Sequence, residues 1–97
     1  MEVQVRIYEA KAGELERFVE EWQARVRPLR ERFGFRVLGA WASEDGRRFV
    51  SVLGYEGPDG FASADARYYA SPDRAALEPD PARLLEGTEA FAARPVG

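Results

Sequence analysis

The chain contains no cysteine, no histidine and no asparagine, and these absences remove most familiar reaction chemistries. Without a thiol or an imidazole there can be no cysteine nucleophile, no Ser-His-Asp triad and no zinc site built from thiolate or imidazole. Haem held by an axial histidine or cysteine is excluded for the same reason. We therefore expect no metal and no cofactor. Only tyrosine, arginine and carboxylate groups remain for proton transfer.

Long apolar runs and excess positive charge are also missing. No stretch approaches the roughly 18 apolar residues of a membrane span, and Met1-Glu2-Val3 leads into a strand pattern without a basic, apolar leader. The net charge of −3 gives no positive field that would attract a polyanion. We expect neither a membrane nor a nucleic-acid partner, and a cytoplasmic location. The scarcity of thermolabile residues fits a heat-adapted source, while the arginine bias fits a GC-rich genome equally well.

The composition that remains is that of one packed domain. The 97 residues, 10.9 kDa in mass, are 45% hydrophobic and 32% charged. A chain of this size and hydrophobicity folds around a single core. We therefore assign residues 1–97 to one domain.

The first third of the chain predicts a strand and a long helix. Val3, Val5 and Ile7 alternate with polar residues, which is the period of a half-buried strand. A helical stripe of apolar residues then begins after Gly13. Its members are Leu15, Phe18, Val19, Trp22, Val26, Leu29 and Phe33. Pro28 interrupts the stripe, so we expect a kink or restart near residues 24–28 and an end at Gly34.

The middle of the chain predicts a β-hairpin whose two faces are both apolar. Residues 35–43 and 48–55 alternate as strands around the turn signal Asp45-Gly46. Helices on one side of a sheet would leave the second apolar face in water. A second copy of the chain is the simplest cover, so we expect a homodimer that associates through this sheet face.

The last third predicts short helices and a closing strand. A helical stretch follows Asp59-Gly60, and Ser71-Pro72 and Asp80-Pro81 each place an N-cap before a proline, starting short helices at residues 72–77 and 81–85. Residues 88–96 can supply the last strand. The order β-α-β-β-α-β indicates an α+β, ferredoxin-like fold with a four-stranded antiparallel sheet and helices on one face.

Three stretches of the sequence carry a family resemblance. Residues 25–29 (Arg-Val-Arg-Pro-Leu) lead to residues 34–41 (Gly-Phe-Arg-Val-Leu-Gly-Ala-Trp), and residues 68–74 (Tyr-Tyr-Ala-Ser-Pro-Asp-Arg) are followed by Pro79-Asp80-Pro81. With these stretches the chain resembles the NIPSNAP family over nearly its whole length. The resemblance implies a dimeric α+β barrel in which two subunits pack sheet to sheet. That superfamily also holds antibiotic-biosynthesis monooxygenases, haem-degrading enzymes and lactone isomerases, whose histidine and asparagine positions have no counterpart in this chain.

Aromatic and basic residues are the candidates for a ligand site, and we identify no catalytic residue. The arginines at positions 25, 27, 30, 32 and 36 form a basic run suited to phosphate or carboxylate, but the four helical ones flank the apolar stripe, so we expect a solvated rim. Helix geometry allows only one of Tyr68 and Tyr69 to face inward, and we choose Tyr69. We expect the carboxylates to serve as caps and turn residues. The candidate ligand-binding residues are Arg6, Tyr8, Arg36, Trp41, Tyr55 and Tyr69, with Trp41 first because it shares strand parity with Val37.

Two functional hypotheses remain. The first is a non-enzymatic module that binds a small apolar or aromatic ligand or serves in interactions. The second is a cofactor-independent monooxygenase or isomerase acting on a small aromatic or lactone substrate. The content of the pocket separates the two: an enzyme should have a cavity of about 300 Å³ or more with an ionisable group pointing into it, whereas a structural barrel should be filled by side chains. Trp22, near the centre of the helical stripe, is assigned to the core.

Overall fold

The chain alternates strands and helices in the order that the sequence predicts. The computed structural model describes residues 1–97. Its elements are β1 (Glu2–Ala10), α1 (Leu15–Glu21), η1 (Trp22–Val26), α2 (Arg27–Arg32), β2 (Arg36–Ala42), β3 (Arg48–Tyr55), α3 (Phe61–Ala70), α4 (Pro72–Ala75), η2 (Pro81–Leu84) and β4 (Leu85–Ala93). The last strand starts at Leu85 rather than at residue 88, because the backbone becomes extended as soon as η2 ends.

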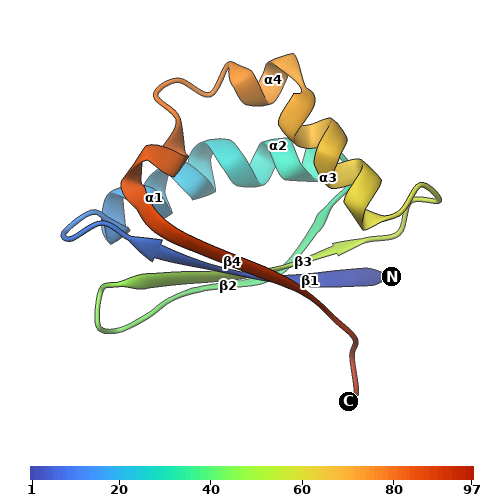
Figure 1. Cartoon of the computed structure of the whole chain (residues 1–97), viewed down its shortest axis with the longest axis horizontal. Helices are drawn as coiled ribbons and strands as arrows, with labels where there is room; N and C mark the ends of the chain where they lie inside the picture. The colour runs from blue at the N-terminus through green and yellow to red at the C-terminus, as the bar shows by residue number, and fades with distance from the viewer.

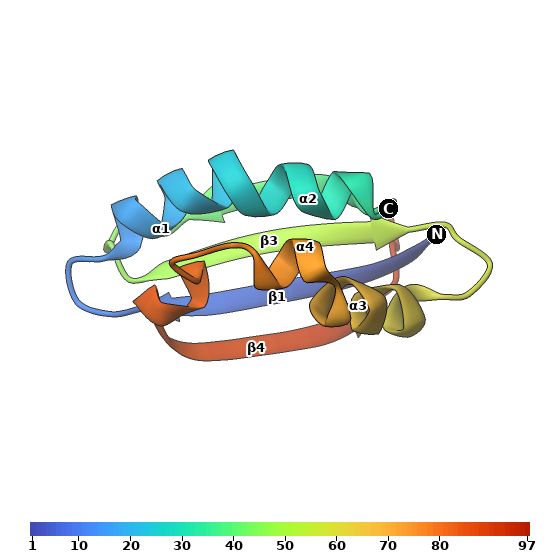
Figure 2. The same cartoon turned by 90° about the horizontal axis from the view of Figure 1, so that it is seen from above.

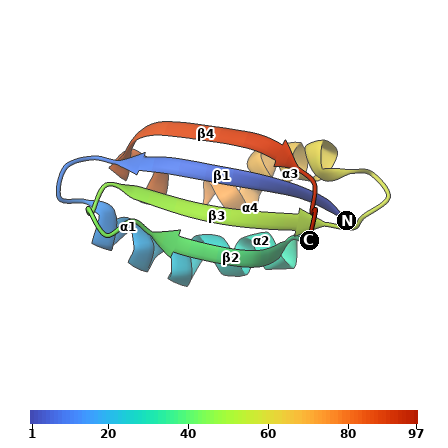
Figure 3. The same cartoon turned by 90° about the horizontal axis from the view of Figure 1, so that it is seen from below.

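The four strands form one antiparallel sheet in the order β2-β3-β1-β4. All helices lie on one of its faces (Figure 1), and no helix covers the other face, where only the C-terminal tail passes across the end of the strands (Figure 3). From above, the run from α1 to α2 lies along β3, and α3, α4 and η2 lie on the side of β1 and β4 (Figure 2). This is the ferredoxin-like arrangement, which confirms the predicted fold class.

The long helix contains a wide turn next to its proline. Pro28 has no backbone N–H, and the five residues Trp22–Val26 before α2 form a π-helical turn in which the Arg27 N–H donates to the Trp22 carbonyl. The predicted disturbance is therefore a widened turn in an otherwise continuous helix. The helix ends at Arg32 with Phe33 as its C-cap, and Gly34 follows with a φ of 92°, a conformation that favours glycine.

A bulge in β2 separates its two halves. Val37 pairs with Leu53, but the next paired residue is Gly39, opposite Val52, so Leu38 is an extra residue. The bulge reverses the parity of every residue after it. Trp41 pairs with Val50 and lies on the uncovered face of the sheet, opposite to Val37. The predicted shared face of Trp41 and Val37 is wrong for this reason.

The register of β1 decides which of its side chains face the helices. Arg6 pairs with Ser51 and Tyr8 with Phe49, and both β3 partners are buried beneath the helices. The even-numbered residues of β1 therefore face inward. Three of the odd-numbered residues, Val3, Val5 and Ile7, form an apolar row on the uncovered face.

Two clusters of buried apolar side chains lie between sheet and helices. The first contains Leu29, Phe35, Leu53, Tyr55, Phe61, Ala64 and Tyr68, and the second contains Ala10, Leu15, Phe18, Trp22, Phe49 and Leu84. Trp22 is only 3% exposed, as its predicted core position requires.

None of the helices is both long and apolar enough to cross a bilayer.

The short helices begin where the sequence predicts. The Ser71 hydroxyl accepts a hydrogen bond from the Arg74 backbone N–H at the start of α4, and the Asp80 carboxylate accepts one from the Ala82 N–H at the start of η2. Both are N-caps in front of a proline at the first helical position. These caps fix the path of residues 71–84 across the helical side of the molecule.

Candidate functional site

A partly open cavity of about 150 Å³ lies between the two core clusters, bounded by the inner face of the sheet and the helices. Its apolar wall includes Phe18, Trp22, Val26, Leu53 and Leu85. Its polar wall consists of three arginines and three tyrosines together with Ser51 and Thr88. The arginines and tyrosines are Arg6, Tyr8, Arg30, Tyr68, Tyr69 and Arg74. An apolar wall facing a few convergent polar groups is the usual composition of a small-molecule site.

Arg6 lies at the centre of the polar wall and is 8% exposed. Its Nε donates to the Tyr8 hydroxyl at 2.8 Å, one terminal nitrogen donates to the Tyr69 hydroxyl at 2.9 Å, and the other donates to the Gln4 side-chain oxygen. Burial alone would lower the Arg6 pKa, but the phenol groups of Tyr8 and Tyr69 outweigh it and raise the pKa. The guanidinium therefore stays charged at any physiological pH.

Arg30, on α2, is 3% exposed and also faces the cavity. It donates to the Asp65 carboxylate at 2.7 Å and to the Tyr69 hydroxyl at 3.2 Å, and its guanidinium lies 3.9 Å from the centre of the Tyr68 ring. The prediction that Arg30 belongs to a solvated rim is therefore wrong. The π-helical turn contains about one residue more than an α-helical turn. The residues of α2 are therefore rotated by roughly 100° from the positions that an uninterrupted α-helix would give them.

Both tyrosines of α3 reach the cavity, so the prediction that only one faces inward is wrong. Tyr68 is 1% exposed, and its hydroxyl has no hydrogen-bond partner. Tyr69 has a half-exposed ring but places its hydroxyl between Arg6 and Arg30. Burial raises the pKa of the Tyr68 and Tyr8 hydroxyls above the ordinary tyrosine value. Both phenols are therefore protonated at neutral pH.

Three other predicted site residues lie elsewhere. Trp41 is 58% exposed on the uncovered sheet face. Arg36 is exposed and forms an ion pair with Glu56 at 3.2 Å. Tyr55 belongs to the first core cluster and donates its hydroxyl hydrogen to Asp59 at 2.7 Å, which raises the Tyr55 pKa. The structure therefore brings together Arg6, Tyr8 and Tyr69, but not these three.

Sequence reasoning missed Arg30, Tyr68, Arg74 and Asp65 as cavity or cavity-supporting residues. Asp65 is not a cap: it lies inside α3 and pairs with Arg30. A signal for this pair was present, because an aspartate in the middle of an otherwise apolar helix face requires a partner. The position of Arg30 depends on the wide turn, which no local pattern specifies.

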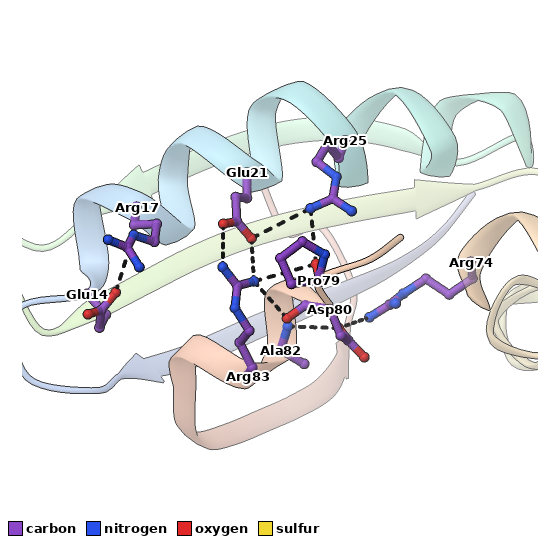
Figure 4. Close-up of polar contacts among 9 residues, drawn as sticks. All are labelled: Glu14, Arg17, Glu21, Arg25, Arg74, Pro79, Asp80, Ala82 and Arg83. Carbon is purple, nitrogen blue, oxygen red and sulfur yellow. Dashed lines mark hydrogen bonds and ion pairs between the residues drawn. The ribbon is translucent and has the colours of Figure 1, made fainter. Parts of the chain in front are cut away.

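A network of hydrogen bonds connects residues 79–83, which include part of the cavity lining, to the long helix and to Arg74 (Figure 4). Arg83 donates to both oxygens of Glu21 at 2.8 Å, and Arg25 donates to the Pro79 carbonyl at 3.0 Å. Arg74 donates to Asp80 at 3.0 Å. The hydrogen bonds from Arg83 lower the Glu21 pKa. Because Pro81 and Ala82 are part of the cavity lining, this network fixes one wall of the site.

Comparison with known proteins gives a consistent set of relatives. A profile of the NIPSNAP family matches residues 3–97. An uncharacterised NIPSNAP domain protein from Burkholderia xenovorans has a TM-score of 0.83 and 24% identity, over 99% of this chain and 95% of that one. A NIPSNAP family protein from Agrobacterium tumefaciens has a TM-score of 0.84 and 18% identity, over 98% and 92% of the two chains.

A more distant structure carries a name that states an activity. A Nitrosomonas europaea protein, provisionally named an antibiotic biosynthesis monooxygenase, has a TM-score of 0.71 and 16% identity over 100% of both chains. At this identity the likeness shows a shared fold and nothing further. A search among curated proteins finds no match.

Proposed function

The chain belongs to the NIPSNAP family, and we propose that it is a small-ligand-binding module without catalytic activity, whose ligand occupies the cavity between the sheet and the helices. The observation that carries this proposal is the convergence of Arg6, Arg30 and Tyr69 on a cavity of about 150 Å³. A protein cavity of about this volume holds one benzene ring. The ligand is therefore about the size of a single ring, although the open side of the cavity allows a substituent to extend outward.

The chemistry of the cavity wall supports binding over acid-base catalysis. A proton-transfer group works best when its pKa is near the operating pH. The ionisable groups that line the cavity are arginines and tyrosines, and the pKa values of Arg6, Tyr8 and Tyr68 are raised further from neutrality. These groups donate hydrogen bonds and hold a charge, which is what a binding site requires.

A ligand screen tests this proposal. Trp22 lines the cavity and Trp41 does not, so a Trp41→Phe chain carries a single indole that reports on the site. We expect single-ring compounds to change its fluorescence saturably, with one ligand per chain and no change in the ligand afterwards. If no compound of this size gives a saturable change, the proposal is wrong. Two-ring and larger compounds are the matched control for cavity size.

The second candidate function is a cofactor-independent monooxygenase or isomerase acting on a small aromatic or lactone substrate. The fold shared with the Nitrosomonas europaea protein supports it, and so does the pairing of buried arginine and tyrosine donors, which would stabilise an enolate. Oxygen uptake and product analysis with the compounds found in the screen distinguish the two functions. Multiple turnovers per chain would show that the protein is an enzyme and would contradict the proposal of a binding module without catalytic activity.

We also propose that two copies associate through the uncovered sheet face. Trp41, Leu38 and Phe91 are 58%, 50% and 47% exposed. Phe91 lies beside Val5 in the half-buried row of Val3, Val5 and Ile7, and Trp41 lies on the same face beside Val50 of β3. Monomers rarely leave a continuous apolar surface of this kind in water. Light scattering should give twice the 10.9 kDa of one chain. A mass of one chain at micromolar concentration would exclude this dimer.

The cytoplasmic location stays a prediction from the sequence.

A further inference from the structure

The polar wall of the cavity carries an unbalanced positive charge. Arg74 has Asp80 at 3.0 Å, and Arg30 has Asp65 at 2.7 Å. Arg6 has only neutral hydrogen-bond acceptors, and its nearest carboxylate is the same Asp65, at 4.0 Å. Two nearly buried guanidinium groups therefore share one carboxylate. Buried charges in proteins are normally paired, so the missing partner of Arg6 is an anion.

The tyrosines of the same wall have hydrogens to donate and no acceptor in the protein. The Tyr8 hydroxyl accepts from Arg6, and the Tyr69 hydroxyl accepts from Arg6 and Arg30. Neither donates a hydrogen bond to another group of the protein. The Tyr68 hydroxyl is buried with no partner at all. Each phenol has one hydrogen to donate. The Tyr68 oxygen has no accessible surface, so the wall offers the O–H groups of Tyr8 and Tyr69 beside Arg6, a cation whose nearest carboxylate is shared with Arg30. Such a set of donors suits an oxygen anion.

The opposite wall limits what the anion is attached to. Phe18, Trp22 and Leu53 give this side an apolar surface, with room for one ring. Resting on the proposed ligand-binding function, we propose that the ligand is a small monocarboxylate, with its apolar body against Trp22 and its carboxylate on Arg6 and the hydroxyls of Tyr8 and Tyr69. A carboxylate offers about four acceptor positions, which matches the donors that Arg6, Tyr8 and Tyr69 present.

The experiment compares carboxylates with their neutral carboxamides in the Trp41→Phe chain. Benzoate, phenylacetate and cyclohexanecarboxylate are each titrated beside the matching amide at neutral pH, with Trp22 fluorescence as the readout and calorimetry as a check. We expect each carboxylate that binds to do so about 10- to 100-fold more tightly than its amide, as is typical of a charge-assisted hydrogen bond.

Two matched substitutions assign the preference to one residue. Arg6→Gln should remove the preference for the carboxylate and leave amide affinity within about threefold. Arg36→Gln makes the same change at an exposed residue outside the cavity and should leave both affinities unchanged. Arg6→Lys retains the charge, and we expect it to keep part of the preference.

The outcomes separate this proposal from the function on which it rests. Amides that bind the wild-type cavity as tightly as carboxylates would overturn the anionic ligand and leave the binding module standing. Failure of every compound in both series would overturn both. A preference that survives Arg6→Gln would overturn the role of Arg6. The comparison of carboxylates with amides in the Trp41→Phe chain does not depend on whether the Arg6 variants fold.

Discussion

Strand β1 has two faces, and each shows the opposite of what a simple inside-outside rule predicts. Gln4, Arg6 and Tyr8 point toward the helices, while Val3, Val5 and Ile7 point to the side that the chain leaves uncovered. A monomer that needed only a stable core would place these residues the other way round. The inversion is what the two proposals require, with the inner face of this strand lining the proposed ligand cavity and its outer face belonging to the proposed dimer interface.

The two tryptophans give the largest test of this comparison. Trp22→Ala removes a buried indole that packs on Phe49 at 4.8 Å between ring centres. We expect a loss of about 3–5 kcal/mol in the free energy of unfolding, measured with urea. Trp41→Ala, on the outer face, should change the stability of a single chain by only about 0.5 kcal/mol. Its main effect should be on dimer dissociation. Equal losses for both would break the comparison.

Asp65 gives the second test, because it is the one carboxylate shared by the two inner arginines. Asp65→Asn leaves Arg30 and Arg6 without a carboxylate partner. Removing one partner from a buried pair costs about 3–5 kcal/mol, and the quarter exposure of Asp65 reduces our expectation to about 2–4 kcal/mol. Asp73→Asn removes an exposed pair with Arg32 and should cost little. If both variants unfold at the same urea concentration, the charges of Arg6, Arg30 and Asp65 are not buried in solution.

Tyr68→Phe and Tyr55→Phe form a third and smaller test. The Tyr68 hydroxyl is buried without a partner, so removing it should leave stability unchanged or raise it by up to about 1 kcal/mol. The Tyr55 hydroxyl bonds Asp59 and Arg67, so its loss should cost about 0.5–1.5 kcal/mol. Thermal unfolding of the two variants checks the difference. A large loss in Tyr68→Phe would mean that this hydroxyl has a partner in the folded chain.

The smallest test concerns acid and the wall held by Glu21. Arg83 lowers the pKa of Glu21 in the folded chain below its ordinary value of 4.5. The folded chain therefore binds this proton less readily than the unfolded chain, so the stabilisation is complete above about pH 5 and is lost as the pH falls through the folded pKa. Glu21→Gln should make unfolding less dependent on pH in this range. Glu16→Gln, an exposed change on the same helix, should not.

The sequence was sufficient for the fold because the fold follows from local patterns. The helical stripe, the turn signal Asp45-Gly46 and the two capped prolines each specify an element without reference to the rest of the chain. Periodicity in β1 predicted a half-buried strand, but period 2 does not say which face is covered. That assignment depends on the pairing with β3, which is a long-range contact.

The candidate site was less predictable because two irregular turns decide it. The extra residue at Leu38 places Trp41 on the outer face, and the wide turn at residues 22–26 rotates Arg30 into the cavity. Each irregularity changes the side to which the later residues of its strand or helix point. Neither has a sequence signal as strong as a cap or a hairpin turn. Arg6 and Tyr8 were identified together because they share parity on a regular strand.

Fluorescence of the two single-tryptophan chains tests the division between the faces most directly. The Trp41→Phe chain reports on Trp22 in the cavity wall, and the Trp22→Phe chain reports on Trp41 on the uncovered face. We predict that a bound single-ring carboxylate changes the Trp22 signal alone, and that dilution to the monomer changes the Trp41 signal alone. A ligand that quenches Trp41 as strongly as Trp22 would place the site outside the inner cavity and contradict this account.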